Sequence, residues 1–307
     1  MDILLGVDTL SYHCRLADGE VSLEQVVQEA SELGADFVQL NAHHVRERSP
    51  DQLAGLRRLA GEVHLGLTLS GDVVGRAADG DSADAGADRV MRWVELAERL
   101  GSPFVRVSSG FYRNEVLGHP ERIQAEQRYL IDALEVTARR AEATGITVLL
   151  ENHSDFTPDE YVEIIQSVGM GRIGVFLDII NPVSMLLDPV PVVRQLAPWA
   201  IAGHAKDYRL QSSYVPDRFH RRGFDVQYCY PGEGVADLPS LIDALVAAQT
   251  TSTYRLSIEG LDNYPGVADQ RERLASSLAL LRRLIQQAGG TTSGTATRPD
   301  HRLQDAG

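Results

Sequence analysis

The chain has 307 residues, 43% of them hydrophobic, which is enough apolar material for the core of one large α/β domain. Its 43 acidic and 29 basic side chains give a formal net charge of −14, and this acidic excess disfavours nucleic-acid backbones and anionic membrane surfaces as partners. The sequence has no apolar run near the roughly 20 residues of a membrane-spanning helix, no signal-peptide pattern at its start and only two cysteines, Cys14 and Cys229, so we expect a soluble, cytoplasmic protein with reduced thiols.

Short apolar segments alternate with longer helical segments eight times along the chain. The apolar segments are brief and often β-branched, which is typical of strands buried on both faces of a parallel sheet. The predicted strands are Ile3–Val7, Phe37–Asn41, Val63–Leu69, Phe104–Ser108, Thr147–Asn152, Ile173–Asp178, Ile201–Lys206 and Leu256–Glu259. The predicted helices, several of them preceded by a capping residue and followed by glycine, are Ser22–Leu33, Pro50–Ala60, Asp88–Leu100, Glu121–Thr144, Pro158–Val168, Pro191–Leu196, Leu238–Ala248 and Val267–Gln287.

Three stretches interrupt this alternation. Asp72–Ala87 is rich in Asp, Gly, Ala and Ser, and its composition predicts a mobile loop. Residues 208–236, after the seventh strand, are longer than an ordinary strand–helix loop and predict a lid or a partner-binding surface. Residues 289–307 have a low apolar content and predict a disordered tail, so we expect a single barrel domain over residues 1–288.

Eight strand–helix units within about 290 residues fit a (β/α)8 TIM barrel in both size and order. A doubly wound open sheet shows the same alternation and is the alternative architecture. The first strand is not followed by a GxGxxG sequence, which removes the usual reason to favour a dinucleotide-binding fold. We therefore predict an α/β, single-domain TIM barrel.

Ionisable residues stand where the predicted strands of the second half end. The active-site groups of TIM barrels lie at the carboxyl ends of the strands. At those ends, LLEN contains Glu151, VFLD ends at Asp178, AGHAKD contains His204 and LSIE ends at Glu259. Three carboxylates brought together without a counter-charge would repel one another, so we expect a divalent cation between them.

The ligand set contains three carboxylates and one imidazole, and this chemistry favours a hard or borderline ion. Mn²⁺ is our first expectation, and Mg²⁺, Co²⁺, Zn²⁺ or Fe²⁺ would also suit it. The alternative is that each residue separately caps a helix or pairs with a basic side chain, as carboxylates in loops often do. Their common position at successive strand ends favours the metal site.

Four further residues are candidates for contacts with a substrate. Lys206 either meets a substrate oxygen or balances the carboxylates around it. Asn152 is the last residue of the fifth predicted strand and Asn181 follows the sixth, where each could position a polar substrate. His43 follows the second strand and either lines the pocket or is an ordinary loop histidine.

The second half of the chain carries ENHSDF at 151–156, FLDIINP at 176–182, GHAKDY at 203–208, PGEG at 231–234 followed by Asp237, and SIEG at 257–260. In order and spacing, these motifs resemble the xylose-isomerase-like TIM-barrel superfamily of sugar-phosphate isomerases and epimerases, which includes the tagatose 3-epimerase-like enzymes. The resemblance covers residues 1–288, and in the first half it consists of the alternation of strands and helices alone.

The resemblance implies that Glu151, Asp178, His204 and Glu259 bind a divalent metal. It also implies that Glu151 and Glu259 exchange protons with the substrate from opposite sides. A metal chelated by a carbonyl and an adjacent hydroxyl acidifies the carbon-bound proton and stabilises the enediolate, while a carboxylate beside it acts as general base. The expected function is a metal-dependent sugar isomerase or epimerase.

One departure from the epimerases opens a second function. They carry a histidine three residues after the sixth-strand aspartate, whereas this chain has Asn181 followed by Pro182. ENHSDF also resembles the catalytic subunits of C-glycoside deglycosidases, which cleave 3-keto glycosides by elimination and use a small second subunit. That resemblance implies that His153 is the base, and otherwise His153 orients a ligand under its loop. The alternative function is therefore a lyase acting on 3-keto C-glycosides.

Two further candidate functions belong to other classes of protein. A catalytically silent barrel that binds a sugar or scaffolds a partner is favoured if the four ligands fail to bind metal. A DNA-repair endonuclease on the same barrel is disfavoured by the charge of −14 and by the lack of a basic run. We expect a small sugar or glycoside as substrate, unphosphorylated because no glycine-rich phosphate loop stands out, and an oligomeric protein.

Overall fold

The predicted strands form one closed parallel barrel in the computed structural model of the chain, which describes residues 1–169, 171–213, 223–260 and 270–293. Their order around the barrel is β1-β10-β7-β6-β5-β4-β3-β2. The strands are β1 (Asp2–Asp8), β2 (Phe37–Asn41), β3 (Gly66–Val73), β4 (Phe104–Ser108), β5 (Thr147–Glu151), β6 (Ile173–Asp178), β7 (Ala200–Ala205) and β10 (Thr253–Ile258). Because β1 pairs with both β2 and β10, the sheet closes, the TIM barrel is confirmed and the open doubly wound sheet is excluded.

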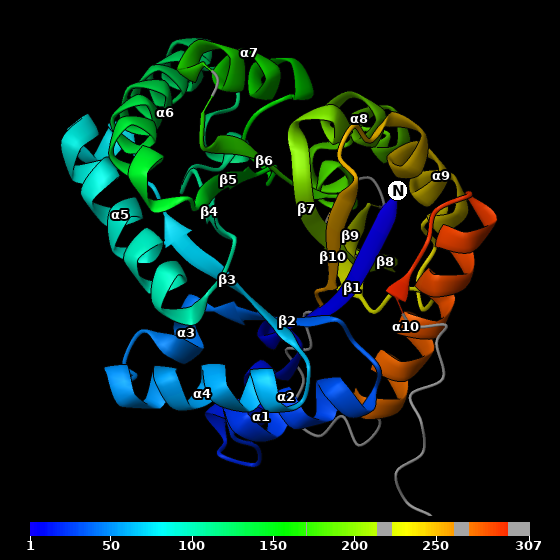
Figure 1. Cartoon of the computed structure of the whole chain (residues 1–307). Coiled ribbons are helices and arrows are strands. Elements are labelled where there is room, and N and C mark those ends of the chain that lie inside the picture. Colours follow the sequence, from blue (N-terminus) through cyan, green and yellow to red (C-terminus); the bar gives the residue numbers. More distant parts are fainter. Residues whose placement is uncertain (170, 214–222, 261–269, 294–307) are drawn as a thin grey trace, which may run out of the picture.

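Helices form a ring around the strands (Figure 1). They are α2 (Leu23–Glu32), α4 (Pro50–Glu62), α5 (Ala83–Leu100), α6 (Pro120–Ala141), α7 (Pro158–Val168), α8 (Pro189–Leu196), α9 (Leu238–Ala248) and α10 (Gln270–Gln287), with the short α1 (His13–Ala17) and α3 (Ala42–Val45) after the first two strands. Several begin where the sequence places caps. Ser22, Ser49 and Thr157 each accept an N–H from the third helical residue and complete a capping box.

Buried apolar side chains fill two layers, one between the strands and the helices and one inside the barrel. The inner cluster consists of Phe104, Leu149, Phe176 and Ala202 from four neighbouring strands. The ring of Phe176 meets the ring of His204 edge-on, with 4.6 Å between centroids. The inner cluster therefore forms an apolar floor beneath the carboxyl ends of β5, β6 and β7.

The predicted loop at Asp72–Ala87 is shorter than the sequence indicates. β3 continues to Val73 and α5 begins at Ala83, after the capping side chain of Ser82. Between them, the carboxylate of Glu126 accepts the backbone N–H groups of Ala77 and Ala78 at 2.7 and 3.0 Å. These hydrogen bonds hold the connection against α6.

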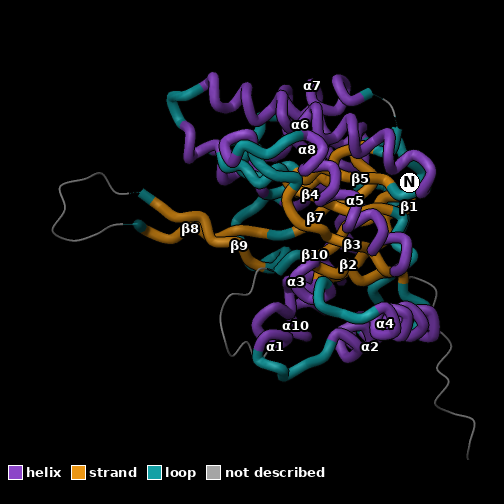
Figure 2. Tube along the Cα trace, turned by 90° about the vertical axis from the view of Figure 1, so that its left-hand side faces the viewer, coloured by secondary structure: helices purple, strands orange, loops and turns teal. Residues whose placement is uncertain are grey.

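Much of the stretch expected as a long loop at 208–236 is a two-stranded antiparallel hairpin. Strands β8 (Asp207–Ser212) and β9 (Phe224–Cys229) pair from Asp207 with Cys229 to Ser212 with Phe224. Figure 2 shows the hairpin projecting away from the barrel. The predicted lid residues 214–222 lie outside the described part of the chain, whereas the register places Tyr208, Leu210, Val226 and Tyr228 on one face of the hairpin.

The first residues of the predicted tail are held against the start of the chain. The N–H of Thr291 donates to the carbonyl of Met1 at 3.0 Å, and the N–H of Ile3 donates to the carbonyl of Thr291 at 2.8 Å. Residues 294–307 lie outside the described part. Within the described ranges, no helix combines the length and the apolar character that a bilayer crossing requires.

Candidate metal centre

The four strand-end residues singled out in the sequence converge at one end of the barrel. Glu151 ends β5, Asp178 ends β6, His204 lies near the end of β7 and Glu259 directly follows β10. All four are buried, and one donor atom from each lies within 4.8 Å of the others. Parallel pairing produces this convergence, because it places Asp178 beside His204 in the ladder between β6 and β7.

The imidazole of His204 lies among the three carboxylates. Its Nδ1 is 3.2 Å from Oε1 of Glu151, 3.5 Å from Oε1 of Glu259 and 3.7 Å from Oδ2 of Asp178. Two donors bound to one ion at about 2.1 Å lie roughly 3–4 Å apart, so these separations suit a shared cation. The residues present therefore fit a divalent metal, with Nδ1 as the imidazole donor.

Two buried cations flank this cluster. The ammonium of Lys206 is 2.9 Å from Oδ2 of Asp178 and 2.6 Å from Oε2 of Glu259. The guanidinium of Arg106, on β4, pairs with the carboxylate of Glu151. The structure thus places Lys206 as a counter-charge to the carboxylates, which is one of the two roles that the sequence left open.

Burial and the neighbouring charges shift the pKa values of the residues in the cluster. Burial alone would raise the pKa of Glu151, but Arg106 and His204 hold it well below its usual range. Burial raises the pKa of Asp178 in spite of Lys206. Burial opposes protonation of His204, yet the neighbouring carboxylates outweigh it and raise its pKa to about 10. The cluster attracts positive charge, as a divalent-cation site must.

A fourth buried carboxylate, Asp8 at the end of β1, was not among the predicted residues. Its Oδ2 lies 3.4 Å from Nε2 of His204 and has no hydrogen-bond partner among the described residues. Gln39 of β2 also faces this nitrogen, at 2.9 Å. With Nδ1 turned towards the cluster, Nε2 lies between the carboxylate of Asp8 and the amide nitrogen of Gln39, and these two side chains position the ring in that orientation.

The sequence contains a feature that indicates each of three further residues near the site, namely Asp8, Gln39 and Arg106. Asp8 directly follows the first predicted strand, so the rule that found Glu151 would also have found it. Gln39 and Arg106 are polar residues inside otherwise apolar strands, FVQLN and FVRVS. Such residues in a barrel strand either point into the site or require another buried partner.

The two asparagines that were predicted to contact a substrate form hydrogen bonds within the protein instead. The side chain of Asn152 donates to the carbonyl of Asp178 at 2.9 Å and accepts its N–H at 2.7 Å. The side chain of Asn181 donates to the carbonyl of Asn152 at 3.0 Å. These bonds fix the end of β6 beside β5, and so fix the position of the Asp178 carboxylate.

The two predicted histidines lie nearer the surface. His153 is half-buried, and its ring meets Tyr112 edge-on with 5.4 Å between centroids. His43 is exposed on α3, where it contacts Arg46 and the ring of His13. Among the described residues, neither imidazole forms a hydrogen bond or ion pair with the four residues of the cluster. The charge of His153 nevertheless contributes to the lowered pKa of Glu151.

Comparison with known proteins supports the same fold. A family described as "Xylose isomerase-like TIM barrel" matches residues 27–284. No curated protein sequence gives a significant match. Among solved structures, a D-psicose 3-epimerase determined in the presence of D-fructose is similar, with a TM-score of 0.71, 17% identity, and coverage of 92% of this chain and 99% of that one.

Two other solved structures show the same likeness. An L-ribulose 3-epimerase has a TM-score of 0.70 and 19% identity, with 94% of this chain and 96% of that chain covered. The IolI protein with a bound zinc atom has a TM-score of 0.70 and 15% identity, with 93% and 99% covered. At these identities the likeness is one of fold.

Proposed function

The chain belongs to the xylose isomerase-like TIM-barrel family, and from that premise we propose that it is a divalent-metal-dependent sugar isomerase or epimerase. The observation that carries the proposal is the buried cluster of Glu151, Asp178, His204 and Glu259 at the carboxyl ends of the strands. We propose Mn²⁺ as the ion, because three carboxylates and one imidazole suit it. When bound, such an ion supplies Lewis acidity to a substrate carbonyl.

We assign the proton transfers to Glu151 and Glu259. Burial opposes ionisation of Glu259, but His204 and Lys206 hold its pKa below the usual range, as Arg106 and His204 do for Glu151. Both carboxylates are therefore ionised near neutral pH and can accept a proton from the carbon beside a carbonyl. One removes that proton, and the other, after taking up a proton from solvent, delivers it to the opposite face of the carbon.

Lys206 has a supporting role in this proposal. Its buried ammonium contacts Asp178 and Glu259 and lies 4.6 Å from the centre of the Tyr228 ring, so it is held from three sides. This position keeps Glu259 ionised and oriented. Asn152 and Asn181 set the position of Asp178, and a substrate contact by His43 stays a prediction, as do an oligomeric state and a small second subunit.

The second candidate is a lyase that cleaves 3-keto C-glycosides by elimination. It is favoured by Asn181, whose amide is bonded to the backbone instead of facing a substrate, and by the partly exposed ring of His153 beside the cluster. In this reaction His153 removes the proton next to the keto group, and the C-glycosidic bond breaks as its electron pair leaves with the aglycone.

Incubation of the Mn²⁺-loaded protein in deuterated water distinguishes the two reactions. We expect free ketoses to gain one deuterium at the carbon beside the carbonyl and to give an epimer or an aldose. Release of the aglycone from a 3-keto C-glycoside would instead identify the lyase. Absence of both deuterium uptake and aglycone release, with Mn²⁺ bound, would contradict an enzymatic function and favour a sugar-binding barrel.

Two variants assign the roles of the residues. Glu259→Gln should lose deuterium uptake, because a neutral amide cannot accept the proton. His153→Ala should retain both Mn²⁺ and deuterium uptake if the protein is an isomerase, and should lose C-glycoside cleavage if it is a lyase. Metal content measured by elemental analysis separates a lost base from a lost ion.

A further inference from the structure

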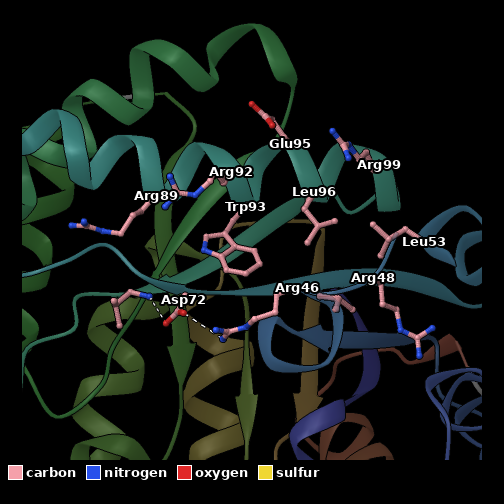
Figure 3. Close-up of a pocket in the computed structure, with 12 residues that line it drawn as sticks. Arg46, Arg48, Leu53, Asp72, Arg89, Arg92, Trp93, Glu95, Leu96 and Arg99 are labelled. Carbon is pink, nitrogen blue, oxygen red and sulfur yellow. Dashed lines mark hydrogen bonds and ion pairs between the residues drawn. The ribbon is translucent and has the colours of Figure 1, made fainter. Parts of the chain in front are cut away.

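A cavity of about 410 Å³ lies outside the barrel, between α5 and the segment that contains α3 and the end of β3. Figure 3 shows Trp93 and Leu96 pointing from α5 towards Arg46 and Asp72 across this space. None of the four candidate metal ligands lines it. Its volume is in the range of small-molecule sites, which is about 300–1,000 Å³.

The lining holds more basic than acidic side chains, although the chain is acidic. Five arginines line the cavity, namely Arg46, Arg48, Arg89, Arg92 and Arg99, against two carboxylates, those of Asp72 and Glu95. In a chain with a net charge of −14, this is a local reversal of sign. Such a reversal on a concave surface attracts anions.

Three of the five guanidiniums already have acidic partners. Arg46 pairs with Asp72 at 3.5 Å, Arg48 pairs with Glu24, and Arg89 pairs with Asp81 at 2.5 Å. Arg89 also donates to the carbonyl of Val74 at 2.8 Å. These three arginines shape the wall of the cavity.

Arg92 and Arg99 differ from the other three. Within the described ranges, neither guanidinium has a hydrogen-bond or ion-pair partner, and both side chains are exposed. They are seven residues apart on α5, which is two helical turns or about 10.5 Å, so they lie on one face. Leu96 stands between them on that face.

Trp93 supplies a rigid aromatic surface beside these arginines. Its indole packs on the backbone of β3 at Gly71, where an added Cβ would lie 3.0 Å from Cγ of the indole. The absence of a side chain at Gly71 therefore leaves room for the indole against the strand. The ring is half-buried and lines the cavity.

We propose that this cavity binds a nucleoside phosphate, with the base against the indole of Trp93 and the phosphates on Arg92 and Arg99. Guanidinium groups bind phosphate oxygens through paired, charge-assisted hydrogen bonds. A flat base gains contact area on an indole, which a simple anion cannot use. This site lies apart from the barrel mouth, so the proposal goes beyond the reaction proposed there and does not depend on it.

A fluorescence titration of Trp93 tests the proposal with ADP as the probe. The chain has two tryptophans, so Trp199→Phe leaves Trp93 as the single reporter. We expect ADP to change its emission saturably. Adenosine and inorganic phosphate should each bind at least about tenfold more weakly, because each offers only part of the ligand.

Paired variants, made in the same Trp199→Phe background, test the arginines. Arg92→Ala with Arg99→Ala should weaken ADP binding by about tenfold or more, while the matched pair Arg128→Ala with Arg139→Ala, on α6, removes the same charge and should leave it unchanged. The proposal is overturned if ADP gives no saturable change up to about 10 mM. It is also overturned if phosphate or adenosine binds as tightly as ADP, or if the α6 pair weakens binding equally.

Discussion

At the scale of single residues, the candidate site depends on a balance of buried charge. Four carboxylates, including Asp8, face Arg106, Lys206 and the imidazole of His204. Unpaired burial of even one carboxylate costs several kcal/mol, on the order of the total stability of a domain. The site is therefore stable only when its positive and negative groups are assembled together.

Asp8→Asn tests the role of the carboxylate behind His204. The amide keeps the shape of the side chain and can still accept the N–H of Leu10, but it removes the negative charge that faces Nε2 of His204. We expect the affinity for Mn²⁺ to fall about tenfold or more, measured by calorimetric titration. The exposed Asp18→Asn is the control, and equal affinity in Asp8→Asn and the parent would contradict this role.

The sequence allowed part of this site to be predicted, and the reason is physical. Glu151, Asp178, His204 and Glu259 interrupt apolar strands at their ends, where ionisable groups are conspicuous. Gln39 and Arg106 lie inside strands and were not recognised. Their partners come from other strands, and contacts between distant segments are visible only once the barrel closes.

At the scale of elements, some strands and helices begin at the predicted residues and others are displaced, such as β3 and β10, which begin three residues away from the predicted Val63 and Leu256. The bounds of β2, β4 and β6 coincide with the predicted ones. The helix α5 begins five residues before the predicted Asp88, because the small residues at its start have the composition of a loop. Position 86 on α5 requires a residue without a side chain, because α6 packs closely against it. An added Cβ would lie 2.6 Å from the hydroxyl of Tyr129, so glycine here serves contact between helices.

Gly203→Ala should strongly destabilise the barrel. A Cβ at this position of β7 would lie 1.9 Å from the carbonyl oxygen of Leu177, so the main chains of β6 and β7 would have to separate. We expect the free energy of unfolding in urea to fall by about 3 kcal/mol or more.

Gly61→Ala is the matched control for that substitution. Gly61 lies near the end of α4 with nothing within 4 Å of an added Cβ, so alanine should stabilise the protein by up to about 1 kcal/mol. A change within about 0.5 kcal/mol for Gly203→Ala would show that the ladder tolerates the displacement.

At the scale of the whole molecule, the candidate ligands join β5, β6 and β7 to β10 across the mouth. An ion that binds only the folded chain stabilises it by mass action, by about 2.7 kcal/mol at a hundredfold excess over its dissociation constant. For a chain of this length that corresponds to a rise in Tm of about 4 °C.

Thermal unfolding with and without Mn²⁺ tests this linkage. The parent protein should show the rise in Tm, and a chelator should reverse it. His204→Ala, which removes one ligand, should show no rise. A rise of equal size in His204→Ala would place the stabilising ion elsewhere on the molecule.

The contact between Thr291 and Met1 has a practical consequence. It lies where β1 begins, whereas Asp8 ends β1 beside the metal cluster, about 20 Å further along the strand. A biotin or surface anchor attached at Met1 would therefore orient every molecule with its open rim towards the liquid. An immobilised layer prepared in this way would present the pocket to small molecules in flow without obstruction by the support.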